Sequence, residues 1–175
     1  CGKWGLGDDR PNDTGLPNDQ GFDHFYGYLN QVHAHNYYPE FLWLNKSKMG
    51  LRNVVVKSPR KYGGFVGGYA AERVDYSHDL VTANALEFIQ ANHTTPFFLH
   101  LALTIPHANN EGTRLFGDGA EVPGYGIYEK EDWPKQDKGQ AAMITRMDRD
   151  VGRILDLLEE LKIDENTLVM FTSDN

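Results

Sequence analysis

The sequence predicts an α/β fold with a parallel sheet, because helical and strand-like patterns alternate along its second half. Residues 77–92 and 139–162 each carry apolar side chains at the spacing of an amphipathic helix. Apolar runs follow them at 97–105 and 168–171, as expected of strands that are buried on both faces. The order helix, strand, helix, strand favours parallel pairing, because parallel strands need a crossover connection.

Size and composition limit the possible classes of protein. The 175 residues suffice for one domain with a sizeable core, and a hydrophobic content of 40% excludes a disordered tail. The net charge of −8 argues against a nucleic-acid partner, since such proteins usually present a basic face. An anionic substrate stays compatible with this charge, because a few local cations decide the potential of a pocket. We also expect no membrane span in this segment, since no apolar stretch is long enough.

The first half predicts loops and one hairpin. Residues 8–20 are rich in Asp, Asn, Pro and Gly and should form a loop. Residues 41–51 place a polar turn at 45–48 between apolar runs, which indicates a hairpin or a strand with a turn. Two glycine pairs lie within 62–69, and neither a lysine nor a helix start follows as a phosphate-binding loop requires. We therefore expect a flexible loop there.

The second half predicts two helix–strand units joined by a long loop. Ser77 is a suitable N-cap for the first helix, and Pro96 separates that helix from the strand at 97–105. Residues 107–137 lack periodicity, and loops of that length directly after a strand end often form the wall of an active site. The second helix carries one apolar stripe of seven residues: Ile144, Met147, Val151, Ile154, Leu155, Leu158 and Leu161.

Candidate functional residues stand at the ends of the predicted strands. Asp174 and Asn175 follow the strand at 168–171, and ligands bind outside the carboxyl ends of strands in open α/β sheets. Their oxygens suit Ca²⁺ or Mg²⁺, although Asp-Asn also simply makes turns. His107 follows the other strand and could hydrogen-bond an oxyanion or protonate a leaving oxygen, or merely cap the strand. Lys3 lies among glycines and is either an oxyanion ligand or an ordinary surface lysine.

Other polar residues favour simpler interpretations. His33 and His35 share strand parity and could bind a transition metal, yet such histidines more often line a pocket, and we expect His35 to contact substrate. His100 lies inside a predicted strand and should be a buried core histidine. Asp148 and Asp150 are about 200° apart around a helix, so they cannot form a carboxylate pair on one face, and pairing with nearby arginines is expected.

Four blocks of the sequence, in order and over nearly the whole chain, resemble type I sulfatases of the alkaline-phosphatase-like superfamily. They are Gly2–Gly7, Gly21–Leu29, Pro96–His107 and Met147–Leu155, followed by the terminal Ser-Asp-Asn. The resemblance implies a sandwich with a mostly parallel central sheet flanked by helices. It also implies that residues 1–175 are part of a single sulfatase catalytic domain, lying between the family's nucleophile motif and its second metal-binding motif.

The resemblance further implies hydrolysis of sulfate esters with a calcium ion, magnesium being second choice. Lys3 and His107 match residues that contact the sulfate group, and Asp174 and Asn175 match metal ligands. The formylglycine nucleophile is expected upstream, because Cys1 is followed by Gly-Lys and lacks the motif of a modified cysteine. A sulfated small molecule or glycan is the implied substrate, and the family suggests a secreted, periplasmic or lysosomal location.

One position departs from the resemblance. Gly5 stands where the family commonly has a histidine that assists the formylglycine hydroxyl, and glycine cannot transfer a proton. Another histidine, with His35 the first candidate, could supply the function. The departure also keeps a non-catalytic sulfated-glycan-binding relative open, and a phosphoesterase or phosphonate hydrolase of the same superfamily is a further alternative.

Overall fold

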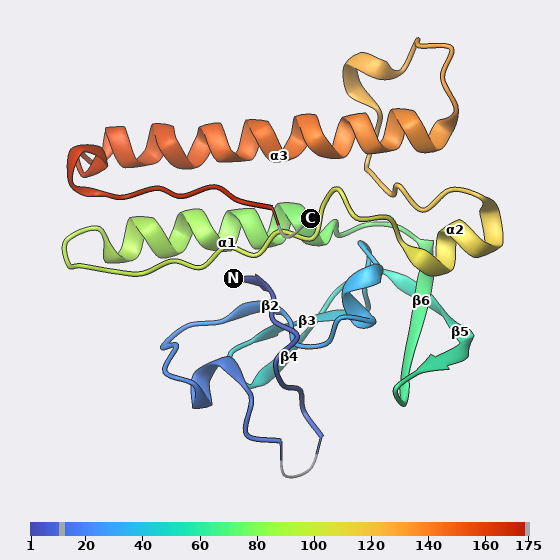
Figure 1. Cartoon of the computed structure of the whole chain (residues 1–175), viewed down its shortest axis with the longest axis horizontal. Helices are drawn as coiled ribbons and strands as arrows, with labels where there is room; N and C mark the ends of the chain where they lie inside the picture. The colour runs from blue at the N-terminus through green and yellow to red at the C-terminus, as the bar shows by residue number, and fades with distance from the viewer. Residues whose placement is uncertain (11–12, 174–175) are drawn as a thin grey trace.

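The computed structural model describes residues 1–10 and 13–173, and its helices and strands form two layers (Figure 1). One layer holds the two long helices, α1 (Ser77–Asn92) and α3 (Lys135–Glu160), which pack side by side. The other layer holds a four-stranded sheet and a two-stranded ribbon. The mixed α/β class predicted from the sequence is therefore confirmed.

The four-stranded sheet follows the order of the chain. Its strands are β1 (Gly2–Lys3), β2 (Tyr26–Tyr28), β3 (Phe41–Leu44) and β4 (Ser47–Gly50). β1 and β2 pair in parallel, whereas the other two pairs are antiparallel. β3 and β4 form the hairpin expected at 41–51, with Asn45 in the left-handed region at φ 53°. In the described residues, parallel pairing is thus limited to β1–β2 and one isolated bridge.

That bridge lies in the segment predicted to be a central strand, 97–105. Lys3 N donates to Ala102 O at 2.9 Å, and Ala102 N donates to Cys1 O at 2.9 Å, so the pairing is parallel. The remainder of the segment forms no strand, Phe98 is 73% exposed, and His100 is exposed and not buried in a core. The prediction for His100 was wrong because, among the described residues, only the short β1 pairs with this segment, and the packing of α1 on Phe97 leaves His100 exposed.

The segment 168–171 also forms no strand in the described part of the chain. Its four apolar side chains are exposed, with Leu168 at 84% and Met170 at 80%. An apolar run becomes a buried strand only where neighbouring strands and helices cover it. Among the described residues, 168–171 pairs with no strand and its side chains stay uncovered, so this structure does not reproduce the pattern that the sequence predicted.

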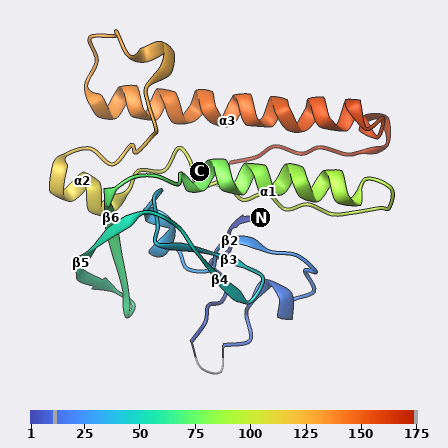
Figure 2. The same ribbon diagram turned by 180° about the vertical axis from the view of Figure 1, so that it is seen from behind.

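The segment 62–69 is ordered, contrary to the expected flexible loop. It joins β5 (Val54–Tyr62) and β6 (Phe65–Glu72), which pair in an antiparallel ribbon. Gly63 and Gly64, at φ 55° and 89°, form the two-residue turn, which only glycine adopts without strain. The second glycine pair, at 67–68, lies inside β6. Figure 2 shows the ribbon beside α2, at one end of the molecule.

Helices were predicted more accurately. α1 matches the expected span, although Tyr76 occupies the N-cap position and Ser77 is the first helical residue. α3 covers 139–162 almost entirely, but Ile144 and Leu155 of its apolar stripe are nearly half exposed. The expected loop at 107–137 contains a short helix, α2 (Asn110–Phe116). No helix of the described part combines the length and apolarity needed to cross a membrane.

Four single-turn 3₁₀ helices complete the architecture: η1 (Pro17–Asp19), η2 (His33–His35), η3 (Gly126–Tyr128) and η4 (Asp164–Asn166). The main apolar cluster lies between the sheet side and the helices. Its buried members are Tyr37, Tyr38, Ala70, Tyr76, Ile105, Ala120 and Met143. This cluster fixes the backbone on either side of η2 and the turn that precedes α2.

Candidate active site

His107 stands on a tight turn that the core holds in place. Its backbone N donates to Thr104 O at 3.1 Å, and the buried Tyr37 hydroxyl bonds to the carbonyls of both Thr104 and His107. The His107 ring is exposed, and its Nδ1 lies 2.7 Å from Ala108 O. Because a carbonyl only accepts, Nδ1 carries the proton, which leaves Nε2 as the basic nitrogen.

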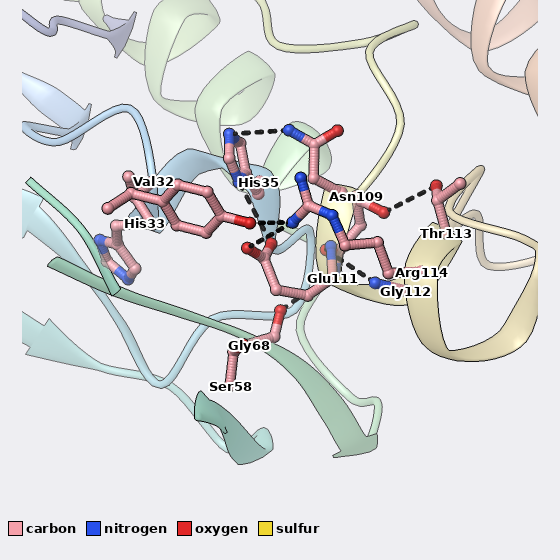
Figure 3. Close-up of polar contacts among 12 residues, drawn as sticks. Val32, His33, His35, Ser58, Gly68, Asn109, Glu111, Gly112, Thr113 and Arg114 are labelled. Atoms are coloured by element: carbon pink, nitrogen blue, oxygen red, sulfur yellow. Dashed lines mark hydrogen bonds and ion pairs between the residues drawn. The ribbon is translucent and has the colours of Figure 1, made fainter. Parts of the chain in front are cut away.

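His35 reaches the same place from η2. The Asn30 side chain starts this turn by accepting from Val32 N at 2.8 Å and His33 N at 3.3 Å. Since η2 is helical and not extended, His33 and His35 diverge, and the predicted shared parity was wrong. The His33 ring packs on Phe41 at 4.5 Å, whereas His35 points toward Glu111 (Figure 3). The two histidines therefore do not form a metal site.

The rings of His35 and His107 stack, with centroids 5.7 Å apart and planes 9° from parallel. On the other side, His35 Nδ1 lies 3.1 Å from Glu111 Oε2, and Asn110 Nδ2 lies 3.3 Å from His35 Nε2. Burial lowers the pKa of His35, and His107 acts in the same direction, while Glu111 opposes both. At neutral pH the His35 ring is consequently neutral, protonated on Nδ1.

Two residues of this arrangement were missed by sequence reasoning. Asn109 is the N-cap of α2, and its side chain accepts from Glu111 N and Gly112 N. The Asn109 amide also donates to the buried Glu121 carboxylate at 3.0 Å. Capping directs Glu111 inward, where its side chain is only 2% exposed. An asparagine followed two residues later by a glutamate was the available signal for this helix start.

Lys3 occupies a different position. It belongs to β1 and lines a small hollow together with Trp4, His24 and His100. Among residues 1–10 and 13–173, the Lys3 ammonium has no hydrogen bond or ion pair, so it is available to a ligand. The structure thus brings His35 and His107 together and places Lys3 apart from them. Asp174 and Asn175, the predicted metal ligands, lie outside the described residues.

The structure explains why position 5 is glycine. Gly5 has φ 80°, a conformation that strains any other L-residue. A Cβ there would lie 2.9 Å from Gln31 Nε2, so Gln31 occupies the space that a side chain at position 5 would need. A histidine at this position would require both a new backbone conformation and a displaced Gln31.

A second polar cluster joins α1 and α3. The donor atoms of His78, Asp79 and Asp150 lie within 4.8 Å of one another, as in some metal sites. However, Asp150 pairs with Arg149 at 2.8 Å and Arg153 at 3.1 Å, and Arg146 pairs with Asp79. These guanidinium groups already neutralise the carboxylates, so a calcium ion does not fit here. The expected pairing of Asp150 with neighbouring arginines is confirmed.

Comparison with known proteins decides the family. The model of the Sulfatase family matches residues 1–175. The chain belongs to the sulfatase family. It is 33% identical over 179 aligned residues to the N-acetylgalactosamine-6-sulfatase of Mus musculus, covering 99% of this chain and 29% of that protein. It is also 27% identical to the arylsulfatase of Hemicentrotus pulcherrimus, covering 99% of this chain and 28% of that protein.

The fold agrees with this assignment. The crystal structure of Ps i-CgsB in complex with k-i-k-neocarrahexaose superimposes with a TM-score of 0.58 over 92% of this chain and 33% of that chain, at 23% identity. The sulfatase resemblance predicted from the four sequence blocks is therefore confirmed. This sulfatase chain spans less than a third of the length of either curated relative.

Proposed function

We propose that residues 1–175 are part of a single sulfatase catalytic domain that hydrolyses sulfate esters. The observation that carries the proposal is the stacked pair of His35 and His107, which two distant sequence blocks bring to one place. In the complete domain, 97–105 and 168–171 would be strands of a mostly parallel central sheet. Their exposed apolar side chains support this, because soluble domains rarely leave such runs uncovered.

His107 and Lys3 would bind the sulfuryl group. His107 presents an exposed Nε2 that donates to an oxyanion when the ring is protonated, and Lys3 carries an ammonium that has no partner among the described residues. Such preorganised groups stabilise the charge that develops on the sulfuryl oxygens in the transition state. His107 is also suited to protonate the leaving oxygen, since a protonated imidazole donates from Nε2.

His35 would take over the role of the histidine that Gly5 replaces. It stacks on His107 and keeps a neutral ring with Nε2 available to accept a proton. Gln31 blocks the position that the usual histidine would occupy, which supports a rearranged site over a damaged one. This geometry favours an active enzyme over the non-catalytic glycan-binding alternative.

Calcium and a formylglycine would complete the site. Asp174 and Asn175 offer the hard oxygen ligands that suit Ca²⁺. Ca²⁺ is preferred to Mg²⁺ because it takes the higher number of such ligands. The metal would supply charge stabilisation on the sulfuryl oxygens, and the formylglycine, contributed from outside this chain, would supply the nucleophile. Since two ligands cannot satisfy calcium, we expect residues 1–175 alone to bind it weakly and to have no sulfatase activity.

The substrate would be a sulfated small molecule or glycan. Relatives named for N-acetylgalactosamine 6-sulfate and the carrageenan-bound structure support a sulfated sugar. The test is turnover of matched sulfate, phosphate and phosphonate esters by the complete domain with calcium present. Preferred hydrolysis of the sulfate ester is expected. Preferred turnover of the phosphate or phosphonate ester would instead favour the phosphoesterase or phosphonate hydrolase alternative. Affinity for a sulfated glycan without hydrolysis would favour the non-catalytic binding protein.

A further inference from the structure

The carboxylate of Glu111 is buried without the partners that such a group normally has. Its side chain is 2% exposed, Oε2 bonds to His35 Nδ1, and Oε1 has no hydrogen bond within the described residues. The nearest cation is Arg114, whose guanidinium lies 3.9 Å from Oε1. Burying a carboxylate with one hydrogen bond costs stability. A purely structural role would be served better by a neutral side chain.

The ribbon makes room for this carboxylate. Gly67 of β6 is buried against it, and a Cβ at Gly67 would lie 2.6 Å from both Cδ and Oε1 of Glu111. Asn109 holds the same residue from the helix side through its N-cap bond to Glu111 N at 3.0 Å. Figure 3 shows Glu111 between β6 and His35, with Asn109 and Arg114 of the α2 region beside it. Strand β6 and the start of helix α2 thus together aim one carboxylate at one imidazole.

We propose that Glu111 is a positioning residue that orients His35 beside His107 and fixes its tautomer. This inference rests on the proposed function, since it gives His35 its role in sulfate-ester hydrolysis. The carboxylate accepts from Nδ1–H, which leaves the Nε2 lone pair as the proton acceptor. The stacked His107 ring limits rotation of His35 from the opposite side. Gly67 contributes indirectly, because its lack of a side chain leaves the space that the Glu111 carboxylate occupies.

The charges around His35 predict how the arrangement responds to pH. Glu111 raises the pKa of His35, whereas burial, His107 and Arg114 lower it. Removing the Glu111 charge while keeping its shape should therefore lower the pKa of His35 further. The acidic limb of turnover should move to lower pH in the same variant, because the ring then stays neutral down to a lower pH.

The experiment compares three single variants in the complete domain: Glu111→Gln, Gly67→Ala and His35→Ala. A double variant that combines Glu111→Gln with His35→Ala completes the set. Glu111→Gln should lower kcat about 10- to 100-fold with KM nearly unchanged, as loss of an orienting partner commonly does. Gly67→Ala should act in the same direction. Exposed Glu159→Gln and the unobstructed Gly50→Ala are matched controls and should have no effect. In the His35→Ala background, Glu111→Gln should have no further effect on kcat.

A second measurement does not depend on activity. The His35 pKa, followed by NMR in the complete domain, should fall in Glu111→Gln and stay constant in Glu159→Gln. An unchanged His35 titration, or an equal loss of kcat with and without His35, would overturn the proposal. If the parent protein hydrolyses no sulfate ester, the proposed function fails, while a shifted His35 titration would still support the positioning by Glu111.

Discussion

The described residues include two histidine–carboxylate pairs, His35–Glu111 and His78–Asp150, and they differ in their surroundings. Both have a nitrogen–oxygen distance within hydrogen-bonding range, 3.1 Å and 2.9 Å. The His78 side chain is fully buried and Asp150 is 1% exposed, with two arginines on the remaining carboxylate oxygen. The His35 side chain is 18% exposed and stacks on an exposed histidine.

The difference separates a pair that stabilises the fold from one that can do chemistry. Burial raises the pKa of Asp150, yet bonds from Arg149 and Arg153 and the nearby His78 more than reverse this and hold it below its usual value. Burial lowers the pKa of His78 despite Asp150, so the ring is neutral and sealed from any ligand. A carboxylate likewise fixes the tautomer of His35, but His35 stacks on the exposed His107. Access, and not the pair itself, distinguishes the candidate site.

Asp150→Ala should have the largest effect and act on stability. It leaves the guanidinium groups of Arg149 and Arg153 without their shared partner and His78 without its bond. Removing one member of a buried ion-pair network typically costs about 3–5 kcal/mol of unfolding free energy. Urea denaturation of the complete domain measures this cost, with the exposed Asp148→Ala on the same helix as control. A loss below about 1 kcal/mol would mean that α1–α3 packing does not need this pair.

His107→Ala and Lys3→Ala should come next and act on turnover. Each removes one electrostatic partner of the sulfuryl group, so kcat should fall about 10²-fold or more. Folding should survive, since His107 is exposed and Lys3 has no side-chain bond in the described structure. Steady-state kinetics and circular dichroism check the two expectations, with His93→Ala at the end of α1 as control. Near-normal kinetics for either variant would remove that residue from the site.

His35→Ala should have a smaller effect on rate and a distinct effect on its pH dependence. We expect about a 10²-fold loss of turnover, the low end for acid–base catalysis, because His107 remains. The acidic limb of the pH–rate profile should flatten, because an imidazole with a pKa lowered by burial no longer titrates there. His33→Ala is the matched control and should change stability alone. An unchanged limb in His35→Ala would contradict the replacement of the histidine absent at Gly5.

These outcomes also bear on what the sequence could predict. α1 and α3 were predictable because the helical period is local, and the hairpin at 41–51 because its turn residues are adjacent. The strands at 97–105 and 168–171 were not reproduced, since a strand depends on neighbours that the described residues do not supply. The ribbon was missed because the glycine pairs were read as a sign of flexibility. Gly63 and Gly64 in fact make a turn, and Gly67 and Gly68 permit close packing.

The candidate site was half predictable for a related reason. His107 was found because it belongs to a recognisable block of sequence, and His35 because its polar, aromatic segment follows another. Glu111 was missed because its partner lies 76 positions away and the contact depends on the open space at Gly67. The stacking of two rings is likewise a property of packing, and no spacing in the sequence encodes it.

The smallest expected effect is the pH dependence of stability from the histidines outside the site. Burial lowers the pKa of His33 to about 4 and also lowers that of His78. The unfolded chain therefore binds these protons more tightly, near the usual value of about 6.5. The stability they contribute is complete above that value and is lost as the pH falls through it toward the folded pKa.

His33 should cost about 1.4 kcal/mol of unfolding free energy between pH values of about 7.5 and 5.5, and His78 should act in the same direction. His33→Gln, which cannot titrate, should reduce this slope in urea denaturation series by one histidine's share. The same substitution at the exposed His100 is the control and should leave the slope unchanged, because His100 loses little contact with water on folding. An equal slope of unfolding free energy against pH in His33→Gln and the parent would show that His33 is hydrated. The contrast between sealed and accessible histidines would then be weaker than the packing of His33 on Phe41 indicates.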